Sequence, residues 1–154
     1  MSVGDGRAQW FDHELPDSLE RAADAVDAWL DTLPFPRERI VLGGWSQGGA
    51  MTYVLGLSAR RPRPAALIAL GAFLPLWERW EPSFEPPLPP VAIGHGSDDP
   101  SVPVGWARIA RRLLEAARAE VVYHETPVGH EIDPTWLPDA RALVKRVTER
   151  RTST

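Results

Sequence analysis

Three separated segments of this 154-residue chain carry side chains that together could perform acyl transfer. Ser46 is the central residue of GWSQG at positions 44–48, which fits the pattern G-x-S-x-G. Two neighbouring acids, Asp98 and Asp99, follow it, and His130 comes later still. A serine hydroxyl is a poor nucleophile near neutral pH and needs a base, which is in turn oriented by a carboxylate. The residue types predict a nucleophile, an acid and a base, but they do not distinguish Asp98 from Asp99.

The segment around Ser46 predicts a sharp turn from a strand into a helix. Residues 39–44 form a short apolar run that ends in glycines, which is typical of a strand buried on both faces, and residues 47–60 have a helical pattern. Glycines two positions either side of the serine remove the Cβ atoms that would collide in such a turn. The serine oxygen would then lie at the positive end of the helix. The backbone N–H of Gln47 is expected to donate to an oxyanion, because this residue follows the serine.

The same alternation of strands and helices runs through the rest of the chain and predicts an α/β fold. Further strands are expected at residues 65–70, 91–94 and 120–124, and helices at 14–33, 104–119 and 136–150. Asp17 followed by Glu20 predicts a capping box at the start of the first helix. Strands that alternate with helices form a parallel sheet through right-handed crossovers. The acids and the histidine would follow the third and fourth strands, at the carboxyl edge where such sheets gather their sites.

Composition excludes several classes of function. The chain has 17 Lys and Arg against 21 Asp and Glu, a net charge of −4, and no basic block that would bind nucleic acid. Without cysteine it has no disulfide, zinc–thiolate site or cysteine nucleophile, and its four scattered histidines give no metal site. No apolar run approaches the ~18 residues of a membrane span, and no signal peptide is visible. We therefore expect a single domain in the cytoplasm, without metal or cofactor.

A proline-rich stretch at residues 71–90 interrupts the regular pattern and contains four aromatic residues. A loop of this length inside a compact domain is usually functional or mobile. One interpretation is a surface excursion whose aromatic side chains pack onto the domain. The other is a wall of a cleft for an apolar ligand, in which Phe73, Trp77 and Trp80 bind substrate together with Trp45, the neighbour of the serine.

The motifs resemble those of the phospholipase/carboxylesterase branch of the α/β-hydrolases, which includes acyl-protein thioesterases and small bacterial carboxylesterases. The matching text is GWSQGGAM at positions 44–51, HGxxDxxVP at 95–103 and GHEI at 129–132, with an aromatic-Asp segment at 7–12 before the first helix. The resemblance implies Ser46 as nucleophile, Asp99 rather than Asp98 as the orienting acid, and His130 as general base and acid. It implies hydrolysis of a small-molecule ester or thioester through an acyl-enzyme, without a cofactor. His95 is expected to have a structural role.

The chain departs from this family at its amino-terminal side. Family members begin with several strands and a His-Gly-rich loop that supplies a second oxyanion N–H, whereas here Met1 falls just ahead of the aromatic-Asp segment. We therefore expect residues 1–154 to form an N-terminally shortened domain of about four parallel strands, with 151–154 as a disordered tail. The strand at 40–42 would become an exposed edge, a site for aggregation or for a homo-oligomer. The alternative is a weakly active or inactive fragment that binds a small molecule or a partner chain.

Overall fold

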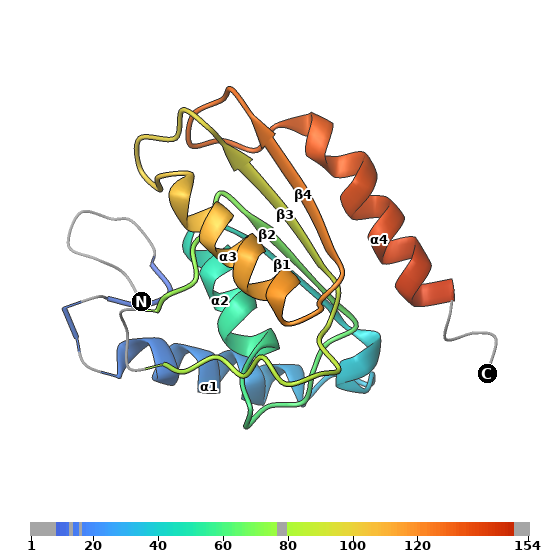
Figure 1. Cartoon of the computed structure of the whole chain (residues 1–154). Coiled ribbons are helices and arrows are strands. Elements are labelled where there is room, and N and C mark those ends of the chain that lie inside the picture. Colours follow the sequence, from blue (N-terminus) through green and yellow to red (C-terminus); the bar gives the residue numbers. More distant parts are fainter. Residues whose placement is uncertain (1–8, 13, 16, 77–79, 150–154) are drawn as a thin grey trace.

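A computed structural model describes residues 9–12, 14–15, 17–76 and 80–149, so the predicted tail at 151–154 lies outside the described residues (Figure 1). Within these ranges four strands form one parallel sheet in the order β1-β2-β3-β4, which confirms the predicted α/β class and the predicted number of strands. The strands are β1 (Val41–Trp45), β2 (Ala66–Leu70), β3 (Val91–Gly96) and β4 (Val121–Thr126). The helices of the described residues are α1 (Ser18–Leu30), α2 (Gln47–Gly56), α3 (Gly105–Ala116) and α4 (Leu137–Glu149), and the 3₁₀ turns are η1 (Arg37–Arg39) and η2 (Pro134–Trp136).

Helices cover both faces of this sheet. Figure 1 shows α1, α2 and α3 on one side and α4 on the other. Alternate side chains of β2 belong to the two different core clusters, because successive side chains of a strand point to opposite faces. Leu67 and Ala69 belong to the larger core cluster under α1–α3, while Ala66 and Ile68 pack in the smaller cluster with Leu143 of α4. This two-sided burial explains why the strands read as continuous apolar runs. None of the helices in the described ranges is long and apolar enough to cross a membrane.

The first helix differs from its prediction at its start. It begins at Ser18, and the predicted capping box is wrong: Asp17 adopts a left-handed φ of 60° and its side chain makes no capping hydrogen bond. The hydroxyl of Ser18 instead accepts from the N–H of Asp12 at 2.9 Å and donates to the carbonyl of Asp12 at 2.7 Å. These two hydrogen bonds tie the start of α1 to the preceding segment.

Two buried arginines fasten α1 to the loops beside it. The guanidinium of Arg61 pairs with Glu20 at 2.9 Å and with Asp24, although only 3% of its side chain is exposed. Arg37 makes two further ion pairs with acids of the last turns of α1 and the residue after it, at 2.5 and 2.6 Å. A buried charge is stable only when it is paired in this way. These contacts fix the position of α1 against the segments before β1 and β2.

Strand β1, which carries the residues before Ser46, lies at one edge of the sheet. It pairs with β2 on one side, and no described strand pairs with its other side. The prediction that this strand forms an edge is therefore confirmed for the described part of the chain. Self-association of the chain through this edge stays a prediction.

Candidate active site

The turn between β1 and α2 presents a single strained residue, Ser46. Its backbone has φ 55° and ψ −123°, a conformation that costs energy for any residue except glycine. The N–H of Ser46 donates to the carbonyl of Leu70 at 2.9 Å, which ties the turn to the end of β2. Gly44 faces Gly48 so closely that a Cβ at position 44 would lie 2.2 Å from the carbonyl carbon and oxygen of Gly48. The strand-turn-helix geometry predicted from G-x-S-x-G is thus present.

The three predicted catalytic residues lie in one hydrogen-bonded chain. The Nε2 atom of His130 is 3.0 Å from Oγ of Ser46, and its Nδ1 atom is 2.6 Å from Oδ2 of Asp99. Asp98 points elsewhere and accepts a hydrogen bond from the hydroxyl of Ser97 at 3.2 Å. The side chain of Asp99 is 1% exposed, whereas that of His130 is 18% exposed. An acid buried behind a partly open histidine and a serine is the arrangement that activates a nucleophile.

The acid loop after β3 and the histidine loop after β4 rest directly on each other. The N–H of Asp98 donates to the carbonyl of Val128 at 3.1 Å, and that of Ser97 donates to the carbonyl of Thr126 at 2.8 Å. Gly96 allows this approach, since a Cβ there would lie 2.2 Å from the carbonyl oxygen of Val128. Backbone contacts therefore set the distance between the carboxylate and the imidazole.

The surroundings of Asp99 favour its ionised form. Burial by itself would raise the pKa of this carboxyl group, but hydrogen bonds from the N–H of Val102, from His130 and from the N–H of Ser101 outweigh it and hold the pKa below its ordinary value. Both backbone donors contact Oδ1 at 2.8 Å, which leaves Oδ2 for the histidine. A carboxylate that stays charged at neutral pH can stabilise an imidazolium.

The two neighbours of Ser46 have different surroundings. Trp45 is 42% exposed, and its ring lies against that of His130 with centroids 4.6 Å apart and a tilt of 34°. The side chain of Gln47 accepts from the N–H of Trp10 at 3.0 Å and donates to the carbonyl of Phe11 at 3.2 Å. Gln47 thus anchors the segment before α1. No signal in the sequence indicated this contact between residues 36 positions apart.

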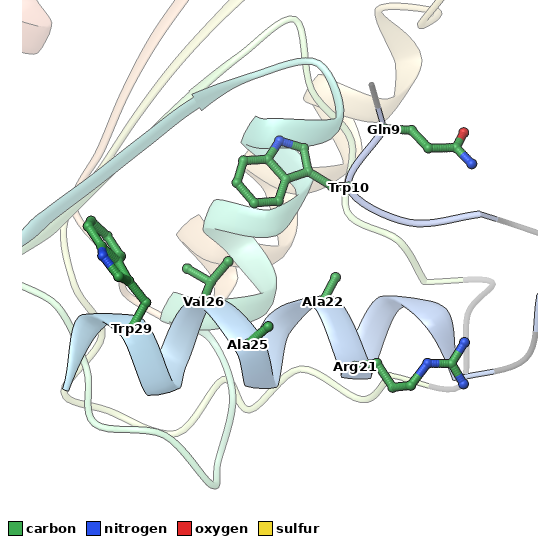
Figure 2. Close-up of a pocket in the computed structure, with 7 residues that line it drawn as sticks. All are labelled: Gln9, Trp10, Arg21, Ala22, Ala25, Val26 and Trp29. Carbon is green, nitrogen blue, oxygen red and sulfur yellow. The ribbon is translucent and has the colours of Figure 1, made fainter. Parts of the chain in front are cut away.

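A groove of about 530 Å³ lies between α1 and the segment that Gln47 anchors (Figure 2). Nothing in the sequence pattern indicated this groove. In the structure Leu19 and Leu30 are buried in the core, while Trp29 is 59% exposed. None of Ser46, Asp99 or His130 lines the groove. The residues that line it are Gln9, Trp10, Arg21, Ala22, Ala25, Val26 and Trp29.

The described aromatic residues of the 71–90 stretch belong to the main core or pack against it. Phe73 and Trp80 are 7% and 4% exposed and belong to the main core cluster, and Phe84 packs against it. Arg63 holds this part of the chain through hydrogen bonds to the carbonyls of Ser83 and Glu85 at 3.2 and 3.3 Å. Trp77 lies outside the described residues. Trp80 and Phe84 thus follow the packing interpretation of the loop, and substrate contact by Phe73, Trp77 or Trp80 stays a prediction.

Glu125 of β4, which pairs with His95 of β3, is the centre of a cluster of charged and polar side chains. Glu125 accepts from Arg108 at 3.0 and 2.5 Å and from the hydroxyl of Tyr123 at 2.7 Å. The hydrogen bonds from Arg108 and Tyr123 lower the pKa of Glu125 to about 2, while burial and Glu125 raise the pKa of Tyr123 to about 12. In the described part of the chain, no group of three or more acid and histidine side chains is arranged to hold a metal ion.

The depressed pKa of Glu125 predicts a pH-dependent contribution to stability. Because the folded pKa lies below the unfolded value, the contribution is present above pH ~4.5 and is lost as the pH falls toward 2. The side chain is partly exposed, so we expect Glu125→Gln to cost about 1 kcal/mol at pH 7, or about 2–4 °C in Tm. Circular dichroism melts from pH 7 to pH 2 measure this. Glu115→Gln, which breaks an exposed pair with Arg111, is the control; an undiminished Glu125→Gln effect at pH 2 would contradict the assignment.

The parallel sheet, the serine at the turn from β1 into α2, the acid after β3 and the histidine after β4 define the α/β-hydrolase fold. A solved structure, the carboxylesterase of Bacillus cereus, superposes with a TM-score of 0.80 over 94% of this chain and 71% of its own, at 19% sequence identity. A model of the phospholipase/carboxylesterase family matches residues 5–148. The chain belongs to the phospholipase/carboxylesterase family, as its motifs suggested.

Two curated fungal relatives have the same name, acyl-protein thioesterase 1. That of Gibberella zeae is 32% identical over 114 residues, which are 71% of this chain and 48% of the relative. That of Neurospora crassa is 34% identical over 133 residues, which are 82% of this chain and 52% of the relative. The chain thus spans about half the length of these two relatives.

Proposed function

We propose that this chain is a serine hydrolase that cleaves carboxylic esters or thioesters through a covalent acyl-enzyme. The observation that carries the proposal is the hydrogen-bonded chain from Ser46 through His130 to Asp99, with distances of 3.0 and 2.6 Å. Membership of the phospholipase/carboxylesterase family supports ester substrates, and the names of the fungal relatives support thioesters.

In the first half of the reaction, Oγ of Ser46 attacks the carbonyl carbon while Nε2 of His130 takes the hydroxyl proton. The carbonyl oxygen becomes an oxyanion, to which the backbone N–H of Gln47 donates. The C–O or C–S bond then breaks, and His130 gives its proton to the departing alkoxide or thiolate. Asp99, already ionised, stabilises the imidazolium throughout.

In the second half, water replaces the leaving group. His130 takes a proton from the water, whose oxygen attacks the acyl carbon, and the bond to Oγ of Ser46 breaks with return of the proton to the serine. The products are the free carboxylic acid and the regenerated hydroxyl. No step in this sequence needs a cofactor. The partly exposed ring of Trp45, which lies against His130, is the aromatic surface best placed to contact the substrate.

The substrate that we propose is a small molecule with an apolar acyl or aryl group. Trp45, Phe73, Trp77 and Trp80 are the aromatic residues of this proposal, and of these Trp45 alone combines exposure with a contact to the triad in the described structure. A cytoplasmic location stays a prediction of the sequence.

A second candidate function is binding without turnover, either of a small molecule or of a partner chain. The observation that favours a partner chain is the edge position of β1, whose outer side no described strand covers. An edge strand with free N–H and C=O groups is a template for pairing. This candidate predicts that Ser46 is unreactive.

Labelling with a fluorophosphonate distinguishes the two candidates. The reagent reacts only with a serine whose hydroxyl is activated, so we expect one adduct, located on the peptide that contains Ser46 by mass spectrometry. Ser46→Ala should abolish the adduct. Ser97→Ala, which removes a hydroxyl of the neighbouring acid loop, should leave it intact. Folded wild-type protein without an adduct on Ser46 would refute the proposed hydrolase.

A further inference from the structure

His95, the fifth residue of β3, lies wholly buried behind the acid loop. Its Nε2 atom is 2.8 Å from the carbonyl oxygen of Val102 and 3.6 Å from Oδ2 of Asp99. The reaction sequence proposed above does not use this side chain. The side chain nevertheless lies close to Asp99 and is also connected to it through Val102.

The contacts of His95 define the position of its proton. A carbonyl oxygen can only accept, so the proton lies on Nε2. The other nitrogen, Nδ1, is buried and has no hydrogen-bond partner within the described residues. A proton on Nδ1 would create a buried cation with an unsatisfied N–H. Oδ2 of Asp99 lies 3.6 Å from Nε2, and Glu125, the β4 partner of His95, is engaged by Arg108 and Tyr123. His95 is therefore a neutral donor through Nε2.

Val102 connects this donor to the carboxylate. Its carbonyl accepts from His95, and its N–H donates to Oδ1 of Asp99 at 2.8 Å. A hydrogen bond on each side of its Cα therefore restrains Val102, and the loop between His95 and Val102 closes around Asp99. We propose that His95 is a positioning residue, which holds Val102 and through it keeps the Asp99 carboxylate aligned with His130. The proposal rests on the proposed function.

The consequence for the reaction follows from the position of Oδ2. This oxygen is 2.6 Å from Nδ1 of His130, and the Nε2–H dipole of His95 adds positive potential on another side of it at 3.6 Å. Without the donor, the buried carbonyl of Val102 loses its partner and the loop can shift. A displacement of about 1 Å at such a site can lower the rate about 100-fold. The loss should appear in kcat rather than in KM, because Asp99 acts on the histidine and not on bound substrate.

The first test uses the wild-type protein and does not require turnover. NMR of protein labelled with ¹⁵N-histidine reports which ring nitrogen is protonated, and we expect His95 to show a protonated Nε2 and an unprotonated Nδ1 at pH 7. The proton between His130 and Asp99 should give a separate downfield signal. An Nδ1–H tautomer or a doubly protonated ring at position 95 would overturn the proposal even if Ser46 proved reactive.

The second test compares two substitutions of the same residue. His95→Leu removes the donor, and kcat for a p-nitrophenyl ester should fall about 100-fold with KM little changed. His95→Gln places an amide N–H where Nε2 lay, and its kcat should recover most of the activity that His95→Leu loses. His124→Leu, which breaks an exposed contact with Asp139 at 2.6 Å, is the matched control and should leave kcat unchanged.

The outcomes separate this proposal from the proposed function. Wild-type kcat in His95→Leu, or equal losses in folded Leu and Gln variants, would overturn the positioning role. If the wild-type protein has no Ser46-dependent turnover, the downfield proton still decides, because it should persist in His95→Gln and disappear in His95→Leu. If His95→Leu does not fold, His95→Gln provides the test. A downfield signal and a kcat close to those of the wild-type protein support the proposal, and loss of both overturns it.

Discussion

Replacing Asp99 with asparagine is expected to lower kcat/KM for p-nitrophenyl ester hydrolysis by about 10⁴-fold. The side chain would keep its size, and its amide oxygen could still accept from the N–H groups of Ser101 and Val102. The amide NH₂ would then face Nδ1 of His130 and donate to it. This forces the proton onto Nε2, which can no longer take the proton of Ser46, and it removes the negative charge that stabilises the imidazolium.

Asp98→Asn is the matched control for this prediction. The two acids are adjacent in sequence, but the carboxylate of Asp98 accepts from the hydroxyl of Ser97, whereas that of Asp99 contacts the histidine. Initial rates of the two purified variants should therefore differ by orders of magnitude, with Asp98→Asn close to the wild-type protein. A larger loss in Asp98→Asn than in Asp99→Asn would exchange their roles and contradict the geometry of the acid loop.

Much of the fold was predictable because its signals are local. The apolar runs of β1 to β4 and the glycines around Ser46 fix strands and a sharp turn without reference to distant residues. Parallel strands end at the same edge, so residues that follow different strands meet there. In agreement with this rule, Oγ of Ser46 and Nε2 of His130 lie 3.0 Å apart although the two residues are 84 positions apart in the sequence.

The identity of the acid could not be decided by the same reasoning. Neighbouring residues of a loop point in different directions, and which one meets the histidine depends on how the loop closes. Here closure is determined by the N–H groups of Ser101 and Val102, which contact Asp99. The family resemblance indicated Asp99, and in the structure it is the carboxylate of Asp99, not that of Asp98, that contacts His130. The role inferred for His95 was equally hidden, because it depends on a buried contact with Val102.

The first helix shows another limit of sequence periodicity. A helical pattern identifies residues that share a face, but not which element covers each part of that face. Leu19 and Leu30 are buried in the core. Ala22 and Val26 pack against the core and also line the groove in Figure 2, which the exposed Trp29 lines as well. The apolar side of α1 therefore has a part that is buried in the core and a part that lines the groove, and the sequence pattern alone does not separate the two.

Gly44→Ala is expected to disrupt the turn that presents Ser46. The new Cβ would lie 2.2 Å from the carbonyl carbon and oxygen of Gly48 and 2.7 Å from the nitrogen of Gly49. These neighbours are backbone atoms of the first turn of α2, so they cannot move without displacing the helix from β1. Overpacking of this kind should cost about 3 kcal/mol or more, which lowers Tm by about 6–12 °C. Fluorophosphonate labelling of Ser46 should be lost even at temperatures where the variant remains folded.

Gly43→Ala separates this effect from a general intolerance of the strand. Gly43 is the preceding residue of β1, and a Cβ there would meet the Cβ of Ile68 at 3.5 Å, an ordinary contact. We expect its stability to stay within about 0.5 kcal/mol of the wild-type value and its labelling to be retained. Successive residues of a strand face opposite sides of the sheet. The new methyl group of Gly44→Ala therefore points to the face covered by α2, and that of Gly43→Ala points to the opposite face. Equal losses in both variants would mean that the edge strand itself is fragile, and that the close approach of Gly44 to Gly48 is not what holds the serine in place.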